Sequence, residues 1–465
     1  MPMRVTVHGA AGDVTGSAYL IETDRARVLL DYGLFQGGER EQRQNRRRPT
    51  FDPKQLDAVL VTHAHLDHTG RLPLLIRNGF RGPVYATAAT VDLMGILLRD
   101  SAFIQQMDAE RALRKHGGVL PDDDRPLYLP EHVEQALGLC RAVEYNQPTL
   151  VSPGITARWV DAGHILGSAS IELRIRDGDT TRTVVFSGDI GPRGVPLLRD
   201  PVLLDEADAV FLESTYGDRD HRSADQSIDQ LADVVTAARV PGGKVLIPSF
   251  AVGRTQRLVY ELGELMRAGA IPETEVVVDS PMATRTTELY RRNRSLFDDE
   301  AWEIIDSGRY PLEFGSLRFT LDAEESKALN HAGGGIVIIS ASGMCTGGRI
   351  RHHLRHGLPR PETHVVFVGF QARGTLGRLL VDGRKEIKMF GRNIDVRAHI
   401  HTLGGLSAHA GQSELVEWMS KLAEHKPRVV LTHGENGPRR ALAGTLEERW
   451  GLKPEMPQLG DIVKL

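Results

Sequence analysis

The first ninety residues consist of short apolar runs separated by glycine or aspartate. The runs are rich in β-branched residues and too short for helices, so each one predicts a strand. They cover residues 3–9, 17–23, 27–33, 57–63 and 82–87. The pattern then becomes helical from 88 to about 145, and the amphipathic stretch 91–117 predicts a helical cover. Strand patterns return at 155–163, 168–178 and 182–191.

A second kind of pattern occupies residues 207–387, where apolar strands alternate with helices. Such alternation is typical of βαβ units and predicts a mostly parallel sheet in a separate α/β domain. The tail from residue 394 to 435 again indicates strand, loop, helix and strand.

Length and composition narrow the class of protein. A chain of 465 residues exceeds the usual size of one hydrophobic core and predicts two domains or one elaborated domain. No apolar stretch reaches the roughly 18 residues that span a bilayer, and the N-terminus lacks the apolar core of a signal peptide. We therefore expect a cytoplasmic protein that does not enter a membrane.

The charge balance neither supports nor excludes nucleic acid as a partner. The net charge of −4 argues against binding by bulk electrostatics, but local patches can supply a positive field. Two basic segments, Arg40–Pro49 and Arg291–Arg294, are candidates, and a solvated loop or helix face is the alternative for each.

The segment VTHAHLDHTG, residues 61–70, concentrates metal ligands directly after a predicted strand. It contains His63, His65, Asp67 and His68. Imidazole and carboxylate together favour zinc or manganese, and the presence of only two cysteines, Cys140 and Cys345, excludes a thiolate site. Four ligands in six residues cannot surround one small ion, so we expect two ions, with one histidine pair on the first and Asp67 and His68 on the second.

The remaining ligands are expected at the ends of later strands. His164 follows the run ARWV, residues 157–160. Asp189 lies just past a strand in VVFSGDIG, residues 184–191, and His433 follows the last strand of the tail. A carboxylate at Asp189 could bridge both ions. Each signal is weak alone, since a histidine at a strand end usually has a structural role, but the set completes two coordination shells.

These motifs resemble those of the metallo-β-lactamase superfamily. THAHLDHTG, DAGHILGSAS and FSGDIG are similar to its ordered metal motifs, and LLDYG, with Asp31, is similar to its first motif. The resemblance implies an αββα sandwich with a dinuclear site at one edge of its two sheets. It also makes Asp31 a residue that orients the ligands.

The long insertion before His433 resembles the β-CASP domain of nucleases related to the cleavage and polyadenylation specificity factor. FLESTYGDRDH resembles the first extra motif of that branch and provides Glu213, while GGLSAHA provides His409 and LTHGE provides His433. Members of that branch that act on DNA tend to lack the histidine of the third motif, so the presence of His433 favours RNA as the substrate. The resemblance implies a metallo-β-lactamase domain at 1–205 and 396–465 with a β-CASP insertion at 206–395, as in minimal bacterial-type members.

Three further segments resemble phosphate-facing loops of the inserted domain. IPSFAVGRTQ, SASGMCTGGRI and GFQARGTLGR provide Ser249, Arg254, Ser342, Gly343 and Arg373 as candidate substrate contacts. The second segment is rich in glycine and precedes a predicted helix, whose N-terminal N–H groups could face a phosphate. An ordinary strand-to-helix turn is the alternative.

The resemblance implies a zinc-dependent ribonuclease that acts on single-stranded RNA as an endonuclease, a 5′-to-3′ exonuclease or both. Two Zn²⁺ ions, with Mn²⁺ as the alternative, would hold a hydroxide that attacks phosphorus and leaves a 5′-phosphate and a 3′-hydroxyl. Among the catalytic residues, Asp67 and Asp31 would serve the metal site, His409 would protonate the leaving oxygen, and Glu213 would orient His409. A small ester or thioester hydrolase, a DNA nuclease and a catalytically silent binding subunit are the alternatives. A homodimer is a further option.

Overall fold

The computed structural model describes residues 3–369, 371–372 and 374–465, which form two compact units. The first unit consists of Met1–Val195, Arg199–Asp220 and His409–Leu465, and the second consists of Pro196–Leu198 and His221–Ala408.

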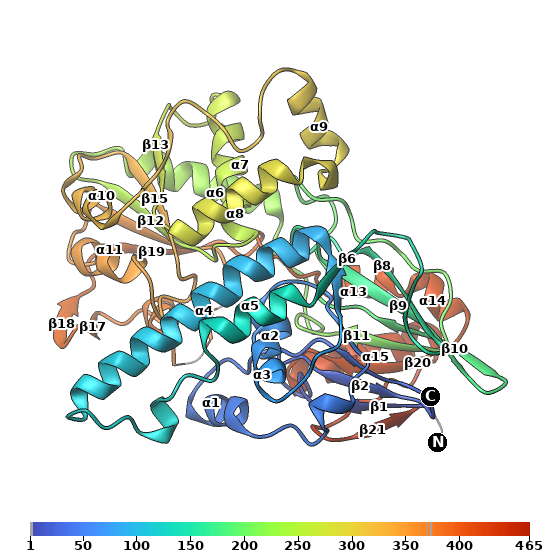
Figure 1. Cartoon of the computed structure of the whole chain (residues 1–465). Helices are drawn as coiled ribbons and strands as arrows, with labels where there is room; N and C mark the ends of the chain where they lie inside the picture. Colours follow the sequence, from blue (N-terminus) through green and yellow to red (C-terminus); the bar gives the residue numbers. More distant parts are fainter. Residues whose placement is uncertain (1–2, 370, 373) are drawn as a thin grey trace. The chain divides into compact units, whose positions relative to one another are not determined.

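The first unit contains two sheets (Figure 1). In the first sheet, the strands from β21 to β3 pair antiparallel and those from β3 to β6 pair parallel. Its strands, in spatial order, are β21 (Ile462–Lys464), β1 (Arg4–Val7), β2 (Tyr19–Glu22), β3 (Arg27–Leu30), β4 (Ala58–Leu60), β5 (Val84–Thr87) and β6 (Cys140–Val143). The second sheet has the order β20 (Arg428–Thr432), β11 (Ala209–Glu213), β10 (Thr180–Phe186), β9 (Ala169–Asp177), β8 (Ile155–Asp161) and β7 (Thr149–Ser152).

The apolar core of this unit lies between the two sheets. Alternate residues of each strand face inward, so side chains such as Leu30 and Tyr19 meet Trp159, Phe186 and Phe211 of the other sheet. The Trp159 Nε1–H also donates a hydrogen bond to the Val61 carbonyl, at 3.0 Å. This bond fixes the chain just before the segment that carries the first metal-ligand candidates.

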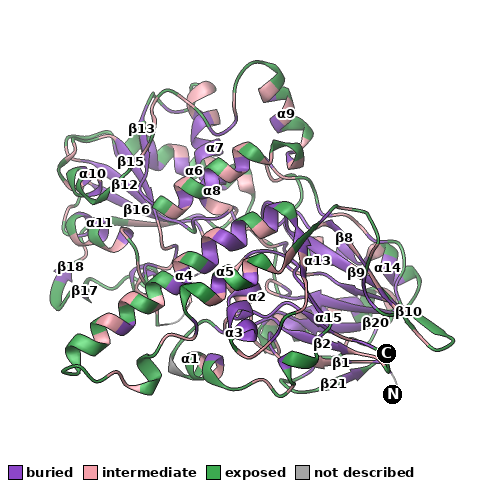
Figure 2. Ribbon diagram, in the orientation of Figure 1, coloured by how far each residue is buried: buried purple, intermediate pink, exposed green. Residues whose placement is uncertain are grey.

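Helices cover the outer faces of both sheets. The first sheet is covered by α4, whose N-terminus is capped by the Thr87 hydroxyl, and by α5 beside it. The outer face of the second sheet packs on α13, α14 and α15, which gives four layers with the buried strands at the centre (Figure 2). The helices of this unit are α1 (Glu39–Arg46), α2 (Leu66–Thr69), α3 (Leu72–Arg77), α4 (Ala88–Lys115), α5 (Pro130–Gly138), α13 (Gln412–Trp418), α14 (Ser420–Glu424) and α15 (Asn436–Trp450), with short 3-10 turns at Pro53–Gln55 and Asp122–Asp124.

The second unit is built on a six-stranded sheet in which all neighbouring strands are parallel. Its order is β14 (Leu317–Phe319), β13 (Glu275–Val278), β15 (Ile336–Ser340), β12 (Lys244–Pro248), β16 (Thr363–Phe367) and β19 (His399–Thr402), and a separate hairpin joins β17 (Glu386–Met389) to β18 (Arg392–Asp395). The helices are α6 (Ala224–Ala237), α7 (Arg254–Arg267), α8 (Pro281–Arg292), α9 (Asp299–Asp306), α10 (Ala323–Ala328), α11 (Ile350–Gly357) and α12 (Leu376–Val381), with 3-10 turns at Arg294–Leu296 and Leu329–His331.

The observed elements confirm the α/β class and the parallel sheet of the inserted region, with three differences from the sequence-based expectation. The helical cover does not continue to residue 145, because β6 pairs in parallel with β5 and becomes an edge strand. The first unit also extends past residue 205 to Asp220, because β11 pairs with β10 and β20. Similarly, residues 396–408 belong to the second unit, where β19 pairs with β16. In the described part of the chain, no helix combines the length and apolar character needed to cross a bilayer.

Candidate metal centre

The first four ligand candidates lie just after β4: His63 and His65 are on the tight loop, and Asp67 and His68 are in the short helix α2 that follows it. Leu34 N–H donates to the Leu66 carbonyl at 2.7 Å, and Ser17 N–H donates to the Asp67 carbonyl at 2.8 Å. Gly33 packs so closely here that a Cβ atom would lie 1.5 Å from the Asp67 carbonyl oxygen. Only glycine fits at that position, so the loop depends on the small residue within LLDYG.

The structure brings all seven predicted ligands together in two groups. The first group is His63, His65, His164 and Asp189, and the second is Asp67, His68, Asp189 and His433. Within each group the ligand atoms all lie within 4.8 Å of one another. Asp189 belongs to both groups.

The two oxygens of Asp189 point to different groups. Its Oδ2 lies 3.4 Å from His63 Nε2 and 3.6 Å from His164 Nε2. Its Oδ1 lies 3.3 Å from His68 Nε2 and 3.3 Å from His433 Nδ1. Asp67 Oδ2 is 3.6 Å from His433 Nε2, which places it in the second group.

The donor set fits a metal ion. His63 Nε2 and Asp189 Oδ1 are buried and make no hydrogen bond, which is costly unless another group satisfies them. Burial, followed by the charge of His68, lowers the pKa of His63 well below its ordinary value. Burial raises the pKa of Asp189, but His433, His68 and His63 outweigh it and hold that pKa well below the usual range. Burial lowers the pKa of His68, but Asp189 and Asp31 outweigh it and raise that pKa well above its ordinary value. An ion binds the neutral imidazole and the ionised carboxylate, so binding at His68 would release a proton.

Asp31 lies behind this set and orients His68. Its Oδ2 is 2.8 Å from His68 Nδ1, and it accepts hydrogen bonds from the Thr62 amide and hydroxyl, each at 2.8 Å. Asp31 has φ of 56°, an uncommon conformation for a residue other than glycine. The contact directs His68 Nε2 toward Asp189.

His409 and Glu213 form a pair beside the first group. Glu213 is buried, accepts a hydrogen bond from the Ile190 amide at 2.6 Å, and lies 3.4 Å from His409 Nδ1. The His409 and His164 rings are 4.6 Å apart between centroids. Burial lowers the pKa of His409, but Glu213, Asp189 and Asp67 outweigh it and raise the pKa to about 9. The contact with Glu213 therefore favours the protonated form of the His409 imidazole.

Two threonines at the site were not predicted from the sequence. Thr62 joins Asp31 to the loop, and the Thr215 hydroxyl lies 3.1 Å from His433 Nδ1. Threonines of this kind follow no recognisable spacing in a sequence, so neither could be predicted. The one indication is that Thr215 lies two residues after Glu213.

Four of the five predicted phosphate-contact residues are described by the structure, and these four belong to the second unit. Ser249 is buried, accepts from the Thr255 hydroxyl at 3.0 Å and donates its own amide to the Ser340 carbonyl, also at 3.0 Å. Arg254 begins α7 and donates to the Val368 carbonyl.

In the glycine-rich loop, Ser342 accepts from the amides of Thr346 and Gly347 at 3.1 and 3.2 Å, and Gly343 accepts from Gln371 at 3.1 Å. Arg373 lies outside the described residues. The role of these five positions in substrate binding stays a prediction.

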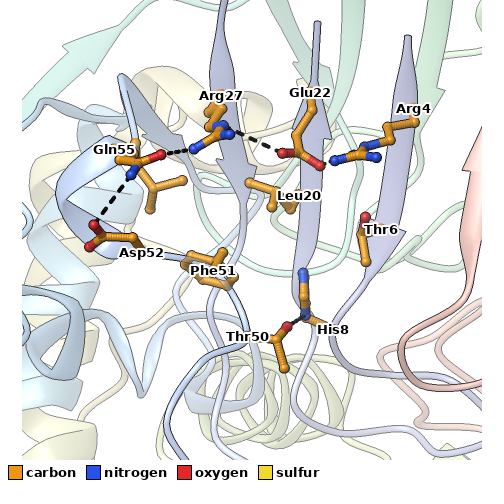
Figure 3. A pocket seen from close by; sticks show the side chains of 11 residues that line it. Arg4, Thr6, His8, Leu20, Glu22, Arg27, Thr50, Phe51, Asp52 and Gln55 are labelled. Carbon is orange, nitrogen blue, oxygen red and sulfur yellow. Dashed lines mark hydrogen bonds and ion pairs between the residues drawn. The ribbon is translucent and has the colours of Figure 1, made fainter. Parts of the chain in front are cut away.

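A pocket of about 360 Å³ is lined by side chains of β1, β2 and β3 and of the segment 50–56 (Figure 3). Its polar walls are paired with one another: Glu22 lies 2.8 Å from Arg4 and 3.4 Å from Arg27. None of the predicted site residues lines it, and we assign it no role in the proposed chemistry.

Comparison with known families gives three matches along the chain. Residues 11–244 match the metallo-beta-lactamase superfamily, residues 255–380 match the Beta-Casp domain, and residues 393–457 match the Zn-dependent metallo-hydrolase RNA specificity domain. The matched ranges include all the predicted metal ligands.

Individual proteins are similar over the full length. A ribonuclease from Thermus thermophilus is 42% identical, covering 99% of this chain and 99% of that protein. A transcription termination factor from Methanothermobacter thermautotrophicus is 32% identical, covering 98% of this chain and 70% of that protein. A crystal structure of a protein of unknown function from Enterococcus faecalis superposes with a TM-score of 0.56 over 100% of both chains at 13% identity, which is a likeness of fold alone.

Proposed function

The chain belongs to the metallo-β-lactamase superfamily and contains its β-CASP domain, and from this premise we propose that it is a zinc-dependent ribonuclease. Membership in the family makes it a metal-dependent hydrolase. The proposal adds the ion, the number of ions and the substrate, which we take to be single-stranded RNA.

The position of Asp189 carries the proposal. One carboxylate with an oxygen in each of two ligand groups is the arrangement expected of a residue that bridges two ions. We assign His63, His65 and His164 to one ion and Asp67, His68 and His433 to the other, with Zn²⁺ as the ion and Mn²⁺ as the alternative. When bound, the ions would supply a nucleophile at neutral pH and neutralise the charge that develops on the phosphate.

The leaving 3′-oxygen needs a proton, and His409 is placed to donate it. Glu213 lies at Nδ1 of His409, so this carboxylate would hold the ring in place beside His164 of the first ligand group. Asp31 and Thr62 would keep His68 in one orientation during turnover. The products would be a 5′-phosphate and a 3′-hydroxyl.

RNA as the substrate is supported by the relatives and by an arginine-rich surface of the first unit. The ribonuclease from Thermus thermophilus is similar over the whole chain, and the match at 393–457 is to an RNA specificity domain. Helix α1 and the residues after it expose five arginines. They are Arg40, Arg43, Arg46, Arg47 and Arg48.

Helix α1 is tied to the metal loop by a short series of hydrogen bonds. The buried Asn45 side chain exchanges two hydrogen bonds of 2.8 Å with the Phe35 backbone. The amide of the adjacent Leu34 donates a hydrogen bond to the Leu66 carbonyl, next to the ligand Asp67. The arginines therefore lie on a helix braced against the centre, where they would contact RNA phosphates.

The proposal is tested with metal-loaded protein, end-labelled linear RNA, circular RNA and DNA of the same sequence. We expect cleavage of linear RNA to products with 5′-phosphates, and much slower cleavage of DNA. Cleavage of the circle would show endonuclease action, whereas products released only from the 5′ end of linear RNA would show an exonuclease.

Two outcomes would count against the proposal. RNA left intact by protein that holds its metal would exclude a ribonuclease. Preferential cleavage of DNA, or hydrolysis of thioesters without cleavage of RNA, would identify another hydrolase on the same metal core.

A further inference from the structure

Three histidines gather on one face of the sheet in the second unit, and none of them belongs to the candidate metal centre. His364 lies on β16, and His399 and His401 lie on the neighbouring strand β19. His364 is in register with His399, and Val366 is in register with His401. Because side chains two residues apart share a face of a strand, all three imidazoles project from the same side of the sheet.

The rings are close enough to share one ion. His364 Nδ1 lies 3.0 Å from His401 Nε2, and the two rings are nearly parallel, at 11° with centroids 5.2 Å apart. The His399 ring stacks on His364 with a centroid distance of 4.9 Å. In the candidate centre, nitrogens assigned to a common ion show the same spacing, 3.1 Å between His65 and His164 and 3.3 Å between His68 and His433.

The expected geometry of a bound ion agrees with this spacing. Zinc–nitrogen bonds of roughly 2.0–2.1 Å at a tetrahedral angle place two ligand nitrogens about 3.3 Å apart. The His364 and His401 nitrogens need to move by only a few tenths of an ångström to reach it.

The electrostatic surroundings favour neutral imidazoles with available lone pairs. Burial, with smaller effects from His401 and His399, lowers the pKa of His364 to about 4. Burial and then His399 lower the pKa of His401. Among the described residues, no carboxylate forms an ion pair with any of the three, so protonation would place like charges together without a counter-ion.

The histidine cluster is partly open to solvent, which leaves room for further ligands of a bound ion. His364 is buried, His401 is half-buried and His399 is exposed, so the cluster runs from the protein interior to solvent. Strand β19 is at the edge of the sheet. The exposed His399 ring is therefore able to turn toward an ion, and water can reach any remaining position.

We propose that His364 and His401, joined by His399 after a rotation of its side chain, form an additional site for a divalent transition-metal ion of the Zn²⁺, Co²⁺ and Ni²⁺ class. Three protein nitrogens and one water are a common shell for zinc. An ion there would bridge β16 and β19 and hold the edge strand on the sheet.

The first test counts ions in a background where the candidate centre is disabled. Metal-stripped Asp189→Ala protein is dialysed against Co²⁺, and the bound cobalt is measured by elemental analysis. We expect at least one ion per chain to remain, and one ion to be lost when His364→Gln and His401→Gln are added. His352→Gln, which changes another histidine of this unit, is the control and should keep the ion. An equal cobalt count with and without His364 and His401 overturns the proposal.

A second measurement uses the parent protein and does not depend on how the variants fold. Histidines are modified with diethyl pyrocarbonate with and without Zn²⁺, and each site is quantified by mass spectrometry. Bound zinc should reduce modification of His399 and His401 at least several-fold and leave His352 unchanged. Unchanged reactivity of His399 and His401 at saturating zinc would mean that the imidazoles only hydrogen-bond and stack.

Discussion

At the scale of single residues, Asp31 acts on the candidate centre through His68. It holds His68 Nδ1 at 2.8 Å and is itself held by Thr62. Asp31→Asn keeps the shape but removes the charge, so we expect the affinity for zinc to fall by roughly 10–100-fold. Titration of metal-stripped protein measures the change. The exposed Asp179→Asn is the control, and equal affinities in the two variants would contradict the role of Asp31.

His409 is proposed to donate a proton and not to bind an ion. A measurement of metal content distinguishes these two roles. If it donates the proton to the leaving oxygen, His409→Ala should lower kcat by roughly 10²–10⁴-fold. The bound zinc should not change. Single-turnover cleavage together with elemental analysis measures both quantities, with the exposed His425→Ala as control. Cleavage at the parent rate, or loss of an ion, would show that His409 has another function.

Asp161 gives a prediction about stability and pH. Burial raises the pKa of this carboxyl to about 6, although the Gly163 amide donates to it at 3.0 Å. The folded state therefore binds a proton that the unfolded chain releases near its ordinary pKa. As the pH rises from about 4 to above 6, this difference in proton binding lowers the free energy of unfolding.

Asp161→Asn removes the free-energy cost of ionising this buried carboxyl. The asparagine side-chain oxygen still accepts the hydrogen bond from the Gly163 amide. We expect the variant to be more stable than the parent by about 3 kcal/mol at pH 8, because each unit of pKa shift corresponds to about 1.4 kcal/mol. The advantage should shrink as the pH falls below 6 toward 4. Urea unfolding at several pH values measures it, and an advantage that is the same at every pH would contradict a buried carboxylate as its cause.

At the scale of elements, the positions of the ligands could be predicted because strands end just before them. Short apolar runs located β4, β8, β10 and β20, and His63, His164, Asp189 and His433 follow these strands. Other elements gave no such signal. Strand β6 is only four residues long and half exposed, and it follows a long helical pattern, so its pairing with β5 decides its structure. Helix α1 has almost no apolar residues, so periodicity could not separate it from a solvated loop.

The arginines on and after α1 provide a prediction at this scale. The slope of the logarithm of RNA affinity against the logarithm of salt concentration reports the number of phosphates neutralised, at about 0.7 for each contact with a single strand. Replacing Arg40, Arg43 and Arg47 by alanine should weaken binding and reduce that slope by up to about 2. The matched control replaces Arg25, Arg174 and Arg176, which are exposed elsewhere in the same unit. Equal slopes in the two triple variants would show that α1 is not part of the RNA-binding surface.

At the scale of the whole molecule, the fold class and the insertion could be predicted, but the limits of the insertion could not. The apolar run at 209–213 has the same appearance in either unit, and only its pairing with β10 and β20 assigns it to the first. The ligands from His63 to His433 could be collected from distant segments because the superfamily motifs are ordered along the chain. Strand register could not be predicted from the sequence. The hydrogen bonds of Thr62 and Thr215 depend on that register, and so does the grouping of His364 with His399 and His401. The cytoplasmic location and the homodimer stay predictions.

Two ions held around Asp189 are proposed to enable the chain to cleave RNA. The most direct test follows the rate of cleavage of single-stranded RNA while zinc is returned to metal-stripped protein. The His364→Gln, His401→Gln variant is used, so that the ions counted belong to the candidate centre. We predict that cleavage rises to its full rate only as the second ion binds, and that Asp189→Asn protein stays inactive at every zinc concentration. RNA that remains intact with two ions bound, or cleavage by metal-free protein at the same rate, would contradict the claim.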